Sequence, residues 1–267
     1  MNDSIAYESM PYGHDEVKEF TALLCDGYKL TGSFTLNEIE KFVRAECKQH
    51  PKDILLATLD DPDQAFYTCG HSIMSHDLNN TDGYDLKSLP PHQFEDGEHI
   101  GYLRTPEEFF IRKKNFLKNV EGKSLSDLSQ KRCWSGITDP VPSLLVPKTV
   151  YSLSRENRSY IQIVNVETCY EALAAFPNGY FADDCDPFQN YILAKHLYKK
   201  FGFKLFGVGA TYLGFMTDSV LNETVNLELA SFLASLYKNY EDDIPHYNVI
   251  AELLAGNTAF YVAYADR

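Results

Sequence analysis

The residues of this chain best suited to chemistry lie in one acidic loop, FADDCDP, and in the segment that follows it. Asp183 and Asp184 belong to the loop, and His196 follows on the helix predicted after Asp186. Carboxylates at this density can hold Mg²⁺ or Ca²⁺, and a histidine that lines a cleft can transfer protons. The structural alternative is that Asp186 caps the helix, Asp183 and Asp184 favour its positive end, and His196 is solvated.

A second group of potential ligands occurs in CGHSIMSHD, which contains Cys69, His71, His76 and Asp77. Thiolate, imidazole and carboxylate are suitable zinc ligands, but this spacing matches no zinc-finger or zincin motif. A pair of loop histidines is the simpler interpretation. We therefore predict no metal site and no cofactor.

Three glycines in GVGATYLGF, Gly207, Gly209 and Gly214, suggest a dinucleotide-binding loop. That fingerprint needs its glycines between a strand and a helix, so that the pyrophosphate meets the helix N-terminus. Here they lie inside an aromatic-rich segment that reads as one strand, so we expect them to allow close packing of a neighbouring helix. The chain also lacks GxxxxGK[ST], GxSxG, HExxH and paired CxxC motifs, which leaves no positive signal for a nucleotide-binding or hydrolytic enzyme.

The remaining candidates are aromatic, in a chain with 18 Tyr and 17 Phe. Tyr180 and Phe181 follow a Pro-Asn-Gly turn and precede Asp183 and Asp184. Tyrosine is favoured at recognition surfaces because it brings a large contact area and a hydroxyl group. A loop that displays these four residues would suit a basic protein partner. A loop that folds back onto its own core explains the same residues equally well.

The formal charge of −14 restricts the classes of partner. Such a field repels phosphate backbones and anionic membranes, so we predict no nucleic-acid or membrane binding. It favours a basic partner, although a plain acidic surface that maintains solubility is the simpler explanation. The N-terminal residues lack the features of a signal peptide, and no apolar run is long enough to span a membrane. We therefore predict a cytoplasmic protein with reduced thiols.

Local signals predict an α+β fold, a mixed or antiparallel sheet flanked by several helices, in either one domain or two subdomains. Thr35 and Glu38 have capping-box spacing, and Asp186-Pro187 has the pattern of a helix start. A proline-rich connection at 138–149 would divide an N-terminal region, 1–137, from a C-terminal region, 150–267. The predicted helices are 14–26, 35–49, 105–119, 124–131, 168–176, 186–201, 222–240 and 247–255, and the predicted strands are 54–59, 65–69, 98–103, 159–167, 204–216 and 258–264.

Residues from about 170 to 240, including FPNGYFADDCDPFQNYILAKHLYKKFGFKLFGVGATYLGF, resemble an uncharacterised bacterial family. That family is known as a domain of unknown function with members near polymorphic toxin loci. The similarity lies in the order of a Gly-aromatic turn, a proline, a helix that ends at Phe-Gly, a strand and an Ala/Leu-rich helix. The chain lacks the tryptophan-rich and Cys-Pro-Asp features of the family. The resemblance implies a bacterial cytosolic protein, with toxin immunity as one role.

Two functional hypotheses follow. The first is a non-enzymatic binding protein, most concretely an immunity protein that neutralises a basic toxin through Tyr180, Phe181, Asp183 and Asp184. The second is a hydrolase or metal-dependent enzyme that uses Asp183, Asp184 and His196, with His71 and His76 as further candidates. The second requires these groups to converge in one pocket.

Overall fold

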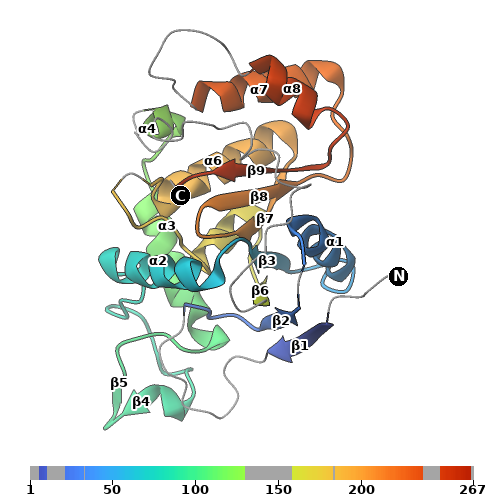
Figure 1. Ribbon diagram of the computed structural model, residues 1–267. Coiled ribbons are helices and arrows are strands. Elements are labelled where there is room, and N and C mark those ends of the chain that lie inside the picture. The colour runs from blue at the N-terminus through green and yellow to red at the C-terminus, as the bar shows by residue number, and fades with distance from the viewer. Residues whose placement is uncertain are drawn as a thin grey trace.

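The computed structural model describes residues 6–10, 22–32, 34–129, 158–182, 184–236 and 247–265. Within these ranges, seven strands form one mixed sheet in the order β1-β2-β6-β3-β7-β8-β9 (Figure 1). Neighbouring strands are antiparallel except for β3 and β7, which are parallel. The strands are β1 (Ala6–Met10), β2 (Gly27–Thr31), β3 (Ile54–Thr58), β6 (Arg158–Val164), β7 (Lys204–Val208), β8 (Tyr212–Met216) and β9 (Ala259–Ala263).

Helices lie on both faces of the sheet, so the predicted α+β class is confirmed. A small second sheet pairs β4 (Phe94–Glu95) with β5 (Glu98–His99). No helix among the described residues has the length and apolar character needed to cross a bilayer. The helices are α1 (Leu36–Glu46), α2 (Pro62–Ser75), α3 (Phe109–Val120), α4 (Leu125–Ser129), α6 (Pro187–Phe201), α7 (Glu223–Leu236) and α8 (Tyr247–Leu254), with 3₁₀ helices η1 (Pro91–Gln93), η2 (Pro106–Glu108) and η4 (Cys169–Ala174).

The central sheet combines strands from both halves of the chain. β3, from the predicted N-terminal region 1–137, pairs with both β6 and β7 from the predicted C-terminal region 150–267. The two regions therefore share one sheet and do not form separate subdomains around sheets of their own. The predicted connection at 138–149 lies outside the described residues.

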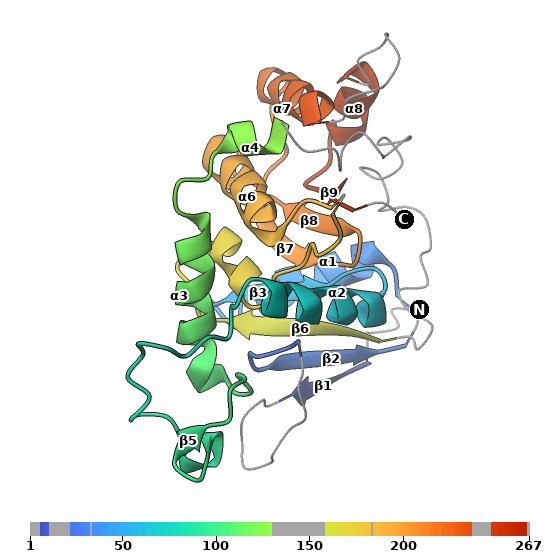
Figure 2. The same ribbon diagram turned by 90° about the vertical axis from the view of Figure 1, so that its left-hand side faces the viewer.

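The two faces of the sheet are covered by different helices. Residues that point to opposite faces alternate along a strand. On one face, the hydroxyl of Tyr261 in β9 donates to the Leu36 carbonyl of α1 at 3.3 Å. On the other face, Tyr160 of β6 packs on Phe66 of α2, with ring centroids 5.0 Å apart. Figure 2 shows α3 and α6 beside the sheet, with α7 and α8 beyond the β9 edge.

Local capping signals predicted two helices correctly. Thr35 and Glu38 form the expected capping box at the start of α1, with the Thr35 N–H donating to Glu38 Oε2 at 2.6 Å. Asp186 caps α6 and accepts from the Phe188 and Gln189 N–H groups. Gly202 ends α6 in the left-handed conformation, with φ of 76°. The contacts at the two N-termini satisfy backbone N–H groups that have no acceptor within the first turn of the helix.

Four predicted elements are wrong in whole or in part. Residues 65–69 belong to α2 and not to a strand, because Asp61 caps a helix that begins at Pro62. Residues 204–216 form two antiparallel strands, β7 and β8, and not one. Residues 98–103 contain only the short β5. Residues 22–26 of the predicted helix 14–26 are not helical, since the Leu24 and Cys25 N–H groups donate to the Gln162 side chain.

Candidate functional site

A short loop connects η4 to α6, and its first residues are fixed to two other elements. Asn178 has no exposed surface, and its side-chain amide donates to the Ala65 carbonyl of α2 at 3.2 Å and to the Gly209 carbonyl at 3.0 Å. Its Oδ1 accepts from the Gly179 N–H at 2.9 Å. These bonds join the loop to α2 and to the β7–β8 turn.

The loop is equally well fixed at its far end. The Cys185 N–H donates to the Tyr264 carbonyl at 2.9 Å, and the Asn190 amide donates to the carbonyls of Asn178 and Cys185. Gly179 has a φ of +114°, and a Cβ there would lie 2.0 Å from the Cys185 carbonyl oxygen. Only glycine fits this backbone, so the loop tip at Tyr180 stands on a rigid base.

Four rings form a continuous row on the surface of α2 and this loop. Tyr180 stacks on His71 with centroids 4.8 Å apart, His71 contacts Tyr67 at 4.3 Å, and Tyr180 contacts Phe181 at 5.4 Å. Tyr67, Tyr180 and Phe181 are 53%, 40% and 49% exposed. We call Tyr67, His71, Tyr180 and Phe181 the aromatic row. Large exposed apolar side chains that touch one another are a feature of interaction surfaces.

Beyond the aromatic row, the exposed surface of α2 leads to a cavity. Met74 follows His71 by one helical turn and is 58% exposed. It also lines a cavity of about 650 Å³ that contains two carboxylates, Asp77 and Asp82, and no lysine or arginine. The other residues that line it are Ile73, Asn79, Asn80, Thr81, Gly101 and Tyr102. An aromatic surface therefore runs into an acidic one.

The predicted binding residues divide into two groups. Tyr180 and Phe181 are displayed, as expected for a recognition loop. Asp184 is only 5% exposed and accepts from the Phe181 N–H at 3.3 Å, so the expectation that the loop displays it is wrong. The buried carboxylate of Asp184 also acts on Tyr264. Burial of Tyr264, together with the charges of Asp60 and Asp184, raises the pKa of its hydroxyl well above the ordinary value. Asp183 lies outside the described residues.

His196, the predicted acid/base group, is not brought near Asp184. It lies on α6 ten positions beyond Asp186, which is about 15 Å along the helix axis. Its ring packs on Phe232 of α7 at 4.4 Å and on Phe201 at 5.8 Å. Burial and Lys200 lower its pKa, and its buried Nε2 has no hydrogen-bond partner. His196 therefore contributes to the packing of α6 on α7.

The four potential zinc ligands are likewise separated. Cys69 is completely buried on the inner side of α2, whereas His71 belongs to the aromatic row. His76 packs on Phe188 at 4.8 Å, and Asp77 lines the acidic cavity. Among the residues the structure describes, no three His, Cys, Asp or Glu side chains are grouped so as to hold a metal ion.

The three glycines of the GVGATYLGF segment do not pack on a helix: Gly207 and Gly209 face Leu59 and Asp60 in the loop after β3, and Gly214 faces Phe206 of β7 and Leu59. A Cβ at Gly207 would meet the Leu59 side chain at 2.5 Å, and one at Gly209 would meet Asp60 Oδ1 at 1.6 Å. Asp60 accepts from the N–H groups of Ala210 and Thr211 and thereby holds the β7–β8 turn. The expectation of helix packing at these glycines is wrong, and Asp60 explains why Gly209 is required.

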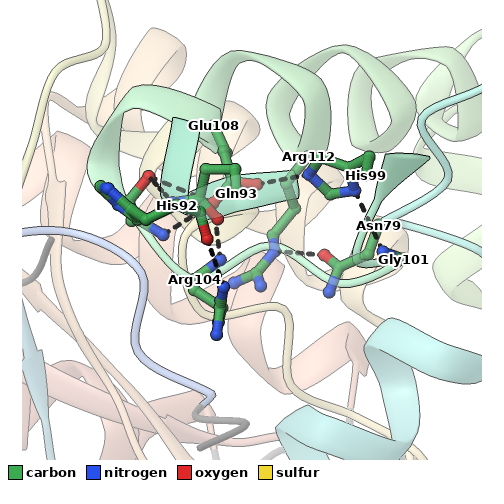
Figure 3. Close-up of polar contacts among 9 residues, drawn as sticks. Asn79, His92, Gln93, His99, Gly101, Arg104, Glu108 and Arg112 are labelled. Carbon is green, nitrogen blue, oxygen red and sulfur yellow. Dashed lines mark hydrogen bonds and ion pairs between the residues drawn. The ribbon is translucent and has the colours of Figure 1, made fainter. Parts of the chain in front are cut away.

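A second polar cluster, centred on Glu108, is buried beneath the β4–β5 hairpin (Figure 3). Glu108 Oε1 lies 2.7 Å from His99 Nε2, and its Oε2 accepts from the backbone N–H groups of Arg104 and Thr105. His99 Nδ1 accepts from the Gly101 N–H at 3.1 Å, so the network places the ring proton on Nε2. Both ring nitrogens are used, which leaves His99 no free atom for proton transfer.

Arg112 extends this cluster towards the acidic cavity. It has no exposed surface, and its Nε donates to Asn79 Oδ1 at 2.9 Å (Figure 3). Burial lowers the pKa of Arg112 and raises the pKa of the neighbouring Cys25 and Cys69 thiols to about 12. Thiols in this state are protonated and unreactive. The cluster is structural, and it supports the wall of the cavity formed by Asn79 and Gly101.

Sequence reasoning missed Tyr67 and His71 as members of the site. The signal was present in Asp61-Pro62, an N-cap followed by a proline at the first helical position. A helix from Pro62 places Tyr67 and His71 four residues apart on one face. Their contact with Tyr180 has no local signal, since more than one hundred residues separate them.

The comparison with known proteins gives no further identification. No protein-family model matches the chain, and no curated protein or solved structure is significantly similar to it. The resemblance of residues 170–240 to a bacterial family of unknown function therefore stays a prediction, and the site is interpreted from its own geometry.

Proposed function

We propose that this chain is a non-enzymatic binding protein whose partner docks on the aromatic row. The observation that carries the proposal is the contact of His71 with rings from two segments, Tyr67 on α2 and Tyr180 on the loop. Partly exposed aromatic side chains on a rigid base lose little conformational entropy on binding and supply most of the energy at many interfaces.

The partner we propose is a basic protein. The chain carries a formal charge of −14, and the cavity next to Met74 is lined by Asp77 and Asp82 with no cation. Charge complementarity of this kind accelerates encounter, whereas desolvated aromatic contacts slow dissociation. A bacterial cytoplasmic immunity protein that covers a basic toxin is the specific form of this proposal, consistent with the resemblance noted above.

The alternative, an enzyme that uses Asp183, Asp184 and His196, has less support. Asp184 is buried within the loop before α6, and His196 lies about 15 Å along α6 from the N-cap Asp186. Proton transfer requires catalytic groups within hydrogen-bond reach of the reacting atoms. The two described members of this set do not meet that condition together.

The test is affinity capture with matched surface variants. Tagged wild-type protein, Y180A/F181A and L227A/V249A are incubated with lysate of the native host at low and moderate salt, and captured proteins are identified by mass spectrometry. Leu227 and Val249 are exposed hydrophobic residues on α7 and α8, away from the row, and serve as the control. We expect one basic protein to bind the wild type and the control, to be lost from Y180A/F181A, and to weaken as salt rises.

The purified partner then gives the quantitative result. We expect Y180A/F181A to raise the dissociation constant by about tenfold or more, equivalent to about 1.4 kcal/mol. Equal affinity of all three proteins for the captured partner would contradict the proposed site. The immunity role is tested separately by co-expression, where the wild type is expected to rescue growth from the partner's toxicity and Y180A/F181A is not.

A further inference from the structure

A second cavity, of about 500 Å³, lies where α1 ends and β7 begins. It is on the sheet face covered by α1. It lies at the end of the sheet where the central parallel strands β3 and β7 begin. The aromatic row is on the opposite face, so the two sites are separate. The residues that line this cavity are Lys41, Arg44, Ala45, Cys47, Lys48, Lys204, Met216 and Asp218.

The charge of this cavity is opposite to that of the whole protein. Four of its eight lining residues are cations, and Asp218 is the only anion among them. The chain as a whole has 24 Lys and Arg against 38 Asp and Glu. A concave surface lined by one sign of charge concentrates its field and raises the local concentration of counter-ions. The local excess of cations therefore indicates an anionic ligand.

Two of the four cations are already engaged. Arg44 Nε donates to Glu40 at 2.7 Å, and its terminal nitrogens donate to the carbonyls of Thr217 and Thr258. Lys204 pairs with Asp218 at 2.7 Å in an exposed ion pair. Such a pair contributes little stability, so Asp218 stands as an internal competitor that an incoming anion can displace.

The ammonium groups of the other two cations, Lys41 and Lys48, make no ion pair or hydrogen bond with the described residues, although the charge of Lys41 is near enough to help lower the pKa of Glu38. Lys41 lies on α1, and Lys48 lies in the turn that follows the helix, where its backbone N–H donates to the Ala45 carbonyl at 3.3 Å. Ala45, Cys47 and Met216 contribute apolar surface to the same cavity. The cavity can thus pair with the charged groups of a ligand and contact its carbon skeleton.

We propose that this cavity binds a small polyanion, a molecule that carries two or more phosphate or carboxylate groups. Lys41 and Lys48 pair with its charges, and Arg44, whose position is fixed by Glu40, Thr217 and Thr258, lines the same cavity. This function is independent of the aromatic row.

Cys47 offers a direct probe of the site. It is the only described cysteine that is not buried, and Cys133 lies outside the described residues, so a C133S background isolates the Cys47 thiol. Its modification by dithionitrobenzoate, a dianionic disulfide reagent, is followed with increasing pyrophosphate or citrate. Burial raises the pKa of this thiol, so the neutral reagent dithiodipyridine is used in parallel to correct for intrinsic reactivity.

We expect saturable protection of Cys47 of about tenfold or more against both reagents, and matching heats in calorimetry with the same anion. K41E/K48E should abolish protection, D218N should tighten binding, and K195E/K199E, the same charge change on α6, should bind like the wild type. Protection by pyrophosphate alone identifies a phosphate ligand, and protection by both anions a general polyanion site.

The proposal is overturned if neither anion protects Cys47, or if K41E/K48E and K195E/K199E titrate alike. Should K41E/K48E fail to fold, the wild-type and D218N titrations decide, because unchanged affinity in D218N contradicts the displacement of Asp218. Loss of this site would leave the aromatic row unaffected, and the partner-capture experiment reports on that row separately.

Discussion

Two regions of this protein place a histidine against aromatic rings, but one histidine is buried and fully hydrogen-bonded whereas the other lies on the surface. His99 is 5% exposed in its side chain, contacts Phe94 and is bonded at both ring nitrogens within the Glu108 cluster. His71 is partly exposed and lies between two surface rings, with Tyr180 stacked on it and Tyr67 in an edge contact.

The difference shows how burial and hydrogen bonding decide the role of the same residue type. A buried charged group is tolerated only when its hydrogen-bonding capacity is satisfied, so the Glu108 cluster is committed to stability. The aromatic row leaves three rings about half-exposed, a surface that the folded chain does not need for itself. Substitutions should therefore separate the two regions, with stability affected in one and binding in the other.

The largest expected effect is at Glu108. Replacing it by alanine leaves His99 and the N–H groups of Arg104 and Thr105 without their acceptor. We expect a loss of about 3–5 kcal/mol in the free energy of unfolding, measured by urea denaturation. The neighbouring Glu107 is exposed, and E107A is the control, with an expected change within about 0.5 kcal/mol. Similar values for both variants would show that the cluster is not stabilising.

The next largest loss of stability is expected at Gly179, which supports Tyr180 at the base of the aromatic row. G179A places a methyl group 2.0 Å from the Cys185 carbonyl oxygen and strains a φ of +114°. We expect a loss of about 1–3 kcal/mol in unfolding free energy, together with weaker partner binding because Tyr180 shifts. G83A, at φ +81° with no atom near the added Cβ, isolates the backbone cost. If G179A is no worse than G83A, the steric argument fails.

A third histidine, His196, extends the comparison, because its lowered pKa should make the stability of the protein depend on pH. Burial lowers the pKa of His196 below 6.5, so the folded state favours its neutral form. Its contribution to stability is present above 6.5 and is lost as the pH falls through the lowered pKa. We expect H196F, which keeps the contact with Phe232, to lose less thermal stability on acidification than the wild type. Burial lowers the pKa of His76 in the same direction, so some acid sensitivity should remain.

The smallest expected effect on stability belongs to the row itself. Y180A/F181A removes rings that are 40% and 49% exposed, and we expect its unfolding free energy to stay within about 0.5 kcal/mol of the wild type. The same variant should show the largest loss of partner binding. A clear fall in its melting temperature would mean that these rings belong to the core, the alternative that the sequence left open.

Some elements could be predicted because their signals are local. Thr35 with Glu38, and Asp186 with Pro187 and Gln189, satisfy free N–H groups within the first turn of their own helices. These helices begin where the sequence indicates, since the stabilising contacts span three residues. The alternation of SYIQIV likewise marked β6.

The same chemistry was misjudged at Asp61-Pro62, where DDPD was interpreted as a turn between strands. Asp61 caps α2 as Asp186 caps α6, and each cap is followed by a proline. A different error was made at 204–216. This segment was predicted as one strand from its composition, but it forms two strands in the fold. The turn between β7 and β8 depends on Asp60, about 150 residues earlier in the chain, and no local pattern records that bond.

The sequence by itself determined the fold class, the acidic charge and the starts of α1 and α6. Only the tertiary structure decided that Asp184 points inward, that His196 packs on α7, and that Tyr180 meets His71. The physical reason is that caps and periodicity act over a few residues, whereas these arrangements depend on hydrogen bonds such as Asn178 to Ala65 and to Gly209. Bonds of that kind form between segments that only the folded chain brings together.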